Sequence, residues 1–185
     1  SFVPRDVILA FEASPSSSGE GSSGGGEHAS LPRCQELDHQ EHLVKKPISL
    51  RGAVRGDYRE LYAAASHRWE DAAIPDHSGE QIKRIQQYLR DHPKVEYFWF
   101  DFWSMPQCAF DDSVNEETGQ PLHRDRKRDD RTAAQKGAFQ TMLKRVNSLY
   151  LGMEVLLIMD LSYVSRFWTQ FEAWLAMQQT TDAGL

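Results

Sequence analysis

The sequence predicts an α/β fold with a parallel sheet, because strand-like and helix-like segments alternate along it. Three short segments are runs of apolar residues, and three longer segments repeat apolar residues on one helical face. The predicted order is strand 61–66, helix 79–91, strand 95–102, helix 132–150, strand 154–160 and helix 165–179. Strands that are joined through helices run parallel to one another, so we expect a three-stranded parallel sheet with flanking helices.

Sequence signals at the helix ends support these boundaries. Ser78 and Gln81 have the capping-box spacing, in which two side chains satisfy free amides at a helix N-terminus, and Thr132 and Gln135 have the same spacing. Gly152 suits the position just after a helix. The residues predicted to be largely buried in the core are Ile82, Ile85, Leu89, Phe98, Phe100, Phe139, Met142, Leu143, Val146, Leu156, Ile158, Phe171 and Leu175.

The first 57 residues contain weaker patterns. Asp6–Glu12 is predicted to be a short strand. The Gly/Ser-rich tract 14–26 should behave as a flexible coil, because it cannot bury enough apolar area to offset the entropy lost on ordering. The predicted organisation is an N-terminal strand or tail at 1–13, a disordered linker at 14–26, an irregular lead-in at 27–57 and an α/β domain at 58–185.

Composition narrows the classes of function. The 185 residues carry a formal charge of −6, which argues against a nucleic-acid partner because phosphate binding needs a basic face. No apolar run reaches the length of about 18 residues that a membrane span needs. Cys34 and Cys108 are too few for a disulfide framework, and His39 and His42 lack a third ligand nearby, so we expect no metal site and a cytoplasmic protein. The chain begins at Ser1, which fits a processed product or a fragment and leaves an organelle open.

Three strand ends are the places where the sequence predicts a site. Ligands of parallel α/β sheets collect outside the carboxyl ends of the strands. In this sequence those ends are the segments 66–69, 101–103 and 160–163, where polar and aromatic residues gather.

Segments at these ends resemble motifs of two families, the TIR domains and the fungal heterokaryon-incompatibility (HET) domains. Tyr62–Trp69 resembles the HET motif Y-x-x-L-S-[YH]-x-W and, with the two acidic residues that follow, the TIR motif F-L-S-F-R-G-x-D. Phe98–Gln107 resembles the HET motif W-I-D-x-x-C-I-x-Q, with Ser104 in place of the cysteine and the glutamine displaced by one. Ser162–Glu172 resembles the TIR stretch S-x-x-Y-x-x-S-x-W-C-x-x-E-L, and Arg166–Leu175 resembles the HET stretch R-G-W-T-x-Q-E-x-x-L.

The resemblance covers residues 58–179 and implies a Rossmann/flavodoxin-like parallel sheet with flanking helices. TIR domains continue with further strands and helices after the third helix, so we expect a fold that is truncated at its C-terminus. The missing strands are deleted, supplied by the N-terminal segment, or absent from a fragment.

The resemblance also implies a chemistry. In enzymatic TIR domains, a glutamate at the position of Glu172 cleaves the nicotinamide–ribose bond of NAD, and a carboxylate there can stabilise the oxocarbenium-like transition state. NAD would then be a substrate, with no permanently bound cofactor. Trp168, one turn before Glu172, would pack on the sugar or base. The other residues expected to contact NAD are Ser66, His67, Arg68, Trp69, Asp101 and Trp103, with Arg68 as the counter-charge for the phosphates.

These residues also have structural interpretations. The helix dipole favours a glutamate near a helix start in any protein. Asp101 could cap the turn that follows it, and a histidine such as His67 after a strand is usually solvated or capping. The same fold can serve as a binding module that self-associates or binds another protein without chemistry, or as a structural subunit of a larger complex. The sequence leaves these functions open.

Overall fold

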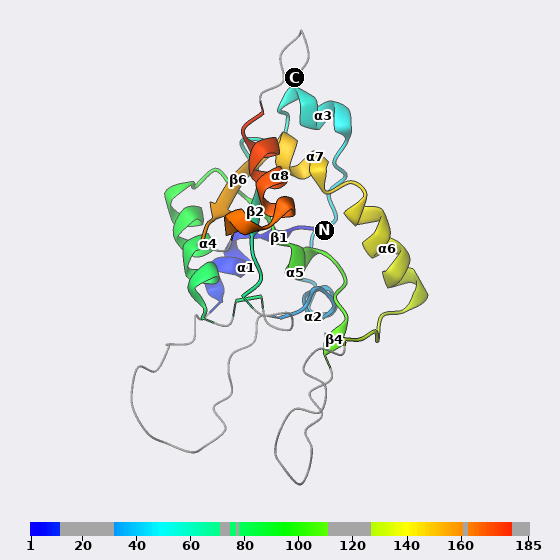
Figure 1. Ribbon diagram of the computed structural model, residues 1–185. Coiled ribbons are helices and arrows are strands. Elements are labelled where there is room, and N and C mark those ends of the chain that lie inside the picture. The colour runs from blue at the N-terminus through cyan, green and yellow to red at the C-terminus, as the bar shows by residue number, and fades with distance from the viewer. Residues whose placement is uncertain (12–31, 71–74, 77, 111–126, 161–162, 179–185) are drawn as a thin grey trace, which may run out of the picture.

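The chain folds into a mixed α/β structure with an open four-stranded sheet and flanking helices (Figure 1). The computed structural model describes residues 1–11, 32–70, 75–76, 78–110, 127–160 and 163–178. The strand order is β1-β3-β2-β6, and the strands are β1 (Val3–Pro4), β2 (Tyr62–His67), β3 (Tyr97–Trp99) and β6 (Glu154–Ile158).

The three predicted strands form a parallel core, which confirms the central prediction. β2 pairs in parallel with β3 on one side and with β6 on the other, so that Ala63 lies opposite both Phe98 and Glu154. β3 is shorter than predicted, because Phe100 is followed at once by the helical turn α5 (Asp101–Ser104). The amides of Trp103 and Ser104 donate to the carbonyl of Phe100, which turns the chain away from the sheet.

The N-terminal segment supplies the fourth strand, and the strand predicted at Asp6–Glu12 is wrong. Val3 pairs antiparallel with Phe98 at the edge of the sheet, and Arg5–Ala10 is the helix α1. Helix α1 is held by Gln86, whose side-chain amide donates to the carbonyls of Ile8 and Phe11 at 2.9 and 2.7 Å. These tertiary hydrogen bonds favour a helix where the local sequence alone reads as a strand.

The sheet is buried on both faces, and the side chains of each strand alternate between two apolar cores. Ala63 and Ala65 face the first core with Phe98, beneath α1 and α4 (Glu80–Asp91), whereas Ala64 faces the second core. Figure 1 shows α4 and α1 on one side and α6 and α8 on the other. The remaining elements are α2 (Cys34–His39), α3 (Leu50–Arg55), β4 (Ala109–Phe110), β5 (Lys127–Arg128), α6 (Ala133–Leu143), α7 (Asn147–Gly152), the 3-10 turn Tyr163–Ser165 and α8 (Phe167–Ala176).

The helix predicted over 132–150 is broken into α6 and α7. At the break, the amides of Arg145 and Ser148 bond to carbonyls three residues back, to Met142 and Arg145, rather than four. This tightening turns the chain so that α7 packs against α3. The sequence contains no glycine or proline at the break, so nothing in the local pattern indicated it.

The three predicted signals at helix ends have different outcomes. Gly152, predicted to lie just after a helix, is instead the last residue of α7. The capping box of Thr132 and Gln135 is present at the start of α6. The capping box of Ser78 and Gln81 does not form: the Ser78 hydroxyl accepts a hydrogen bond from the amide of Glu80 at 3.2 Å, and the Asp76 carboxylate accepts from the amide of Gln81 at 3.0 Å. Asp76 and Ser78 therefore share the capping of α4, each accepting from different backbone amides.

Most of the predicted core is confirmed. The buried members are Ile82, Ile85, Leu89, Phe98, Phe100, Val146, Ile158 and Leu175, and the half-buried members are Phe139, Met142, Leu156 and Phe171. Leu143 is 47% exposed, which corrects the prediction, because α6 has no fully buried residue and rests loosely on the second core.

Other predictions for this part of the chain have mixed outcomes. The disorder prediction for 14–26 lies outside the described residues. The segment 32–57, expected to be irregular, contains α2 and α3. None of the helices in the described ranges is long and apolar enough to cross a membrane.

Gly152 gives a test of the α3–α7 packing. A Cβ atom added at Gly152 would lie 2.5 Å from the Cβ of Ala53, so we expect Gly152→Ala to lower the free energy of unfolding. Overpacking of this kind costs about 1–3 kcal/mol. Gly137→Ala in α6 is the matched control, because its added methyl group meets nothing within 4 Å, and we expect it to stabilise the protein by about 0.5–1 kcal/mol. Chemical denaturation measures both, and a harmless Gly152→Ala would contradict the close contact.

Candidate functional site

A pocket of about 260 Å³ lies at the carboxyl ends of β2 and β3 and beside α8. Two carboxylates, Asp101 and Glu172, line it together with the tryptophans Trp69, Trp99 and Trp168. The other lining residues are Met105, Gln107, Phe139, Leu143, Val146 and Tyr150. No lysine or arginine is among the described residues that line it, so the pocket is aromatic and anionic. We call it the Glu172 pocket.

Glu172 is held inside the fold rather than at its surface. It is 4% exposed, although it belongs to the second turn of the surface helix α8. Its carboxylate accepts a hydrogen bond of 2.5 Å from the Ser66 hydroxyl, which lies 2.6 Å from the hydroxyl of Tyr163. The side chains of Tyr150 and Trp168 also hydrogen-bond to the carboxylate. Residues from β2, α7 and α8 therefore fix its position.

Burial sets the ionisation of Glu172. Desolvation raises the pKa of the carboxyl group to about 7, although the hydrogen bonds from Ser66 and Tyr150 oppose this by favouring the ionised form. The nearby charge of Asp101 adds to the increase. Ionised and protonated forms of Glu172 are thus both present near neutral pH, which is the condition that acid–base and electrostatic catalysis require.

Asp101 is anchored from two sides. Its carboxylate accepts hydrogen bonds from the indole of Trp69 at 2.9 Å and from the amide of Phe102 at 2.6 Å. The contact with Phe102 is the turn-capping role, and the lining of the pocket is the functional one, so Asp101 combines both interpretations. These bonds place one carboxylate oxygen and the Trp69 ring together at the pocket wall.

His67 is buried behind this wall. Its ring stacks on Phe100 with centroids 4.2 Å apart, and its Nε2 atom lies 3.4 Å from a carboxylate oxygen of Asp101, too loosely placed for a hydrogen bond. Burial lowers the pKa of His67, which keeps the ring neutral near pH 7. The prediction that a histidine here is usually solvated is therefore wrong, because the strand carries it into the core.

The structure brings together only part of the predicted set. One pocket is lined by four of the predicted residues, Trp69, Asp101, Trp168 and Glu172. Ser66 donates a hydrogen bond to the carboxylate of Glu172. Ser66 and His67, although predicted to contact the ligand, do not line it, and neither do two further predicted residues.

Arg68 is the first of these. It does not line the pocket, and its guanidinium donates to the carboxylate of Asp160 at 2.8 and 2.9 Å, so its role as counter-charge for the phosphates stays a prediction. Trp103 is the second: it is fully buried and packs against the rings of Phe11 and Phe100, so it cannot touch a ligand.

Seven residues that line the pocket were not predicted as site residues, and two of them, Tyr150 and Gln107, act through polar side-chain atoms. Tyr150 reads in the sequence as the last member of an apolar helical face, and the structure uses its hydroxyl on Glu172. Gln107 donates to the carbonyls of Asp101 and Met105 at 3.1 and 3.0 Å, which fixes the loop under the pocket. The motif resemblance contained Gln107, but nothing in its spacing showed that it contacts this loop.

Comparison with protein-family models, with curated proteins and with solved structures finds no match to this chain. No group of three or more His, Cys, Asp or Glu side chains within the described ranges is arranged to hold a metal ion.

Glu172 predicts a pH-dependent stability. Its pKa is 4.5 in the unfolded chain and about 7 in the fold, so its protonated form is favoured by folding. That contribution is fully present below pH 4.5 and is lost as the pH rises through 7, by up to about 3 kcal/mol. Glu172→Gln keeps a neutral side chain at every pH, so we expect its stability relative to the wild type to increase between pH 5 and 8.5. Urea denaturation across this range measures the difference.

Glu96→Gln, which changes an exposed carboxylate, is the matched control for this experiment. A difference between Glu172→Gln and the wild type that stays constant from acid to alkaline pH would show that the carboxyl group is not desolvated.

Proposed function

We propose that this chain is a TIR/HET-like domain that binds NAD in the Glu172 pocket and hydrolyses its nicotinamide–ribose bond. The observation that carries the proposal is the buried, ionisable carboxyl group of Glu172, fixed by hydrogen bonds beside an aromatic pocket at the carboxyl ends of parallel strands.

The order of the parallel strands supports a flavodoxin-like class. Along the sheet, the parallel strands follow the order β3-β2-β6, which is second, first, third in the chain. This is the beginning of the flavodoxin-like order, whose ligands bind where the direction of the strand order reverses. Here that reversal falls between β2 and β6, next to Ser66 and Glu172.

The site also supports the motif resemblance. Trp69, Asp101 and Glu172 belong to three separate motif matches, and they line one pocket. A chance resemblance in three distant segments would not require their characteristic residues to meet in space.

The charge of the pocket fits one end of NAD. The oxidised nicotinamide ring is a flat cation, and aromatic faces and carboxylates both attract such a group, more strongly where water is excluded. Trp69 and Trp168 supply the aromatic walls, while Asp101 and Glu172 supply the negative charge. At about 260 Å³ the pocket is smaller than most whole-ligand pockets, so it would take the nicotinamide and its ribose and leave the diphosphate outside.

The reaction follows from these contacts. As the bond between nicotinamide and the ribose C1′ breaks, its electron pair leaves with the now neutral nicotinamide, and C1′ becomes oxocarbenium-like. Ionised Glu172 stabilises that positive charge. Water then adds to C1′, and its proton passes to the Glu172 carboxylate and on to solvent. The products are nicotinamide, ADP-ribose and a proton.

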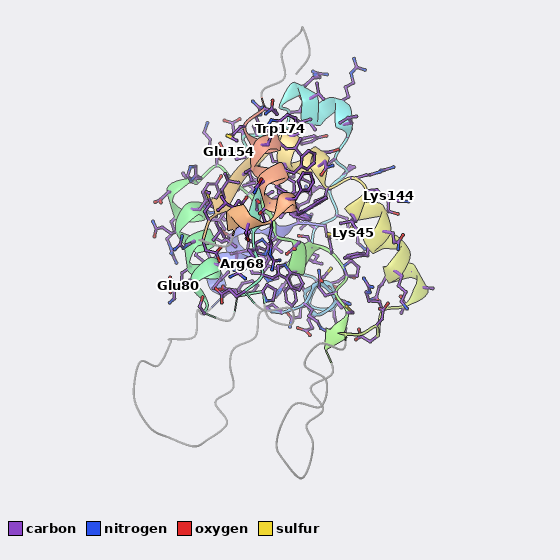
Figure 2. All side chains as sticks on the ribbon, in the orientation of Figure 1. Lys45, Arg68, Glu80, Lys144, Glu154 and Trp174 are labelled. Atoms are coloured by element: carbon purple, nitrogen blue, oxygen red, sulfur yellow. The ribbon has the colours of Figure 1, made fainter. Side chains whose placement is uncertain are left out.

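A second candidate function rests on the outer face of α8. Phe167 is 79% exposed and Trp174 is 50% exposed, and both rings stack on Phe171 with centroids 6.1 and 5.9 Å away. Trp174 is marked on this helix in Figure 2. A row of exposed aromatic rings is typical of a protein interface, so self-association or binding of another protein is the alternative.

Replacement of Glu172 tests the catalytic role. We expect Glu172→Gln to lower the rate of nicotinamide release about 100- to 1000-fold, as the loss of one transition-state contact does in other enzymes. Release of nicotinamide from NAD is measured by chromatography, with circular dichroism to verify the fold and Glu96→Gln as the control. Unchanged turnover in Glu172→Gln would contradict the role of this residue. A wild-type protein that is inactive at high concentration would favour the interaction module.

Tyr150 tests the ionisation that catalysis needs. Because the ionised form of Glu172 opposes the oxocarbenium, the rate should rise with pH through a midpoint near 7. The Tyr150 hydroxyl lowers the pKa of Glu172, so Tyr150→Phe should move this midpoint to higher pH. The pH profile of kcat/KM measures it, with Tyr58→Phe, outside the pocket, as the control. An unchanged midpoint in Tyr150→Phe would show that the ionisation of Glu172 does not set the pH dependence of the rate.

A further inference from the structure

A second pocket of about 770 Å³ lies next to the Glu172 pocket, and α6 runs between the two. On α6, Phe139 and Leu143 line the Glu172 pocket, whereas Thr141 and Met142 line the second one. Trp99 borders both. The second pocket also takes residues from the N-terminal strand region, the segment before α3 and α7.

The second pocket is positively charged, in contrast to the first. Lys46, Lys144 and Arg145 line it, and no aspartate or glutamate is among its described lining residues. Lys144, marked in Figure 2, follows the last residue of α6. We call this site the basic pocket.

The charges of the basic pocket are available to a ligand. Within the described ranges, Lys46, Lys144 and Arg145 take part in no ion pair, whereas other cations of this acidic chain, such as Arg68 and Lys94, pair with carboxylates. The Lys46 ammonium lies 4.6 Å from the centre of the Tyr97 ring, which positions the charge without neutralising it.

The floor of the basic pocket is apolar and aromatic. Phe2 and Trp99 are 2% and 4% exposed and form its base, and Met142 and Leu149 form its sides. A volume of about 770 Å³ lies in the usual range of small-molecule sites. The pocket therefore fits a ligand that has a flat apolar part and a compact, strongly negative part.

We propose that the basic pocket is a nucleotide-binding site, which takes a purine nucleoside phosphate with its phosphate group at Lys46, Lys144 and Arg145 and its base over the apolar floor. Phosphate oxygens accept charge-assisted hydrogen bonds from ammonium and guanidinium groups. Bases stack on aromatic and apolar side chains. The hydroxyl of Ser148 on the wall provides a partner for the ribose. This site does not depend on the reaction proposed for the Glu172 pocket.

Calorimetric titration of the purified chain with AMP tests the proposal. We expect one AMP per chain, and an affinity that falls about tenfold in Lys46→Gln and in Arg145→Gln because each removes a charge-assisted hydrogen bond. Arg90→Gln on α4 removes an exposed arginine far from the pocket and should bind AMP like the wild type. Adenosine lacks the phosphate of AMP and ribose 5-phosphate lacks its base, so both should bind more weakly than AMP.

The location is tested by variants of the other pocket. Glu172→Gln and Trp168→Ala should keep the wild-type affinity for AMP, since neither residue lines the basic pocket. Wild-type protein that does not bind AMP, or AMP affinity that is unchanged in both Lys46→Gln and Arg145→Gln, would overturn the site. If Arg90→Gln lowered the affinity for AMP as much as the pocket variants do, the binding would be general charge attraction and the site would be overturned. Ribose 5-phosphate that binds as tightly as AMP would overturn the assignment to a nucleotide.

Discussion

The small side chains of the central strand are the constraint on which the rest of the structure depends. Ala63–Ser66 of β2 are all fully buried, and none is larger than a serine. A strand without bulk cannot fill the space above and below the sheet, so Phe98 and Trp99 of β3 and Phe100, which follows β3, fill it from the side. The same lack of bulk lets α8 approach β2 so closely that Glu172 reaches the Ser66 hydroxyl. The core and the candidate site thus have one origin.

Burial of the ionised Glu172 carboxylate lowers the free energy of unfolding, so its presence here calls for a functional or structural reason. Within the described ranges no lysine, arginine or histidine pairs with Glu172, and its neutral partners only partly offset the desolvation. An apolar side chain of similar volume would give a more stable core. Groups that strain a fold in this way gather at functional sites, and the open pocket beside Glu172 supports that interpretation over a purely structural one.

The sequence predicted what depends on periodicity and missed what depends on tertiary contacts. The parallel strands, α4 and α8 follow from apolar spacing, and the motifs at the strand ends indicated Trp69, Asp101, Trp168 and Glu172. The N-terminal helix was read as a strand because the hydrogen bonds from Gln86 that favour it come from a distant helix.

The ion pair of Arg68 with Asp160 was missed for a related reason, because the two residues end different strands and their distance is set by the sheet. Tyr150 shows the same limit in another form. An apolar helical face predicts that its ring is buried, but only the fold reveals which group its hydroxyl contacts. Site residues that act through one polar atom on an apolar body are the hardest to recognise in sequence.

The two candidate functions use opposite faces of the same helix. Glu172 and Leu175 face inward from α8, whereas Phe167 and Trp174 face outward. Trp168 lies between them, since it lines the pocket and is still 45% exposed. A partner that covers the outer face would therefore also bury Trp168 and exclude water from the pocket that it borders. Because exclusion of water strengthens the attraction between a carboxylate and a cationic ring, assembly and catalysis would reinforce each other in this geometry. The proposed enzyme and the proposed interaction module would then be two uses of one helix rather than competing alternatives.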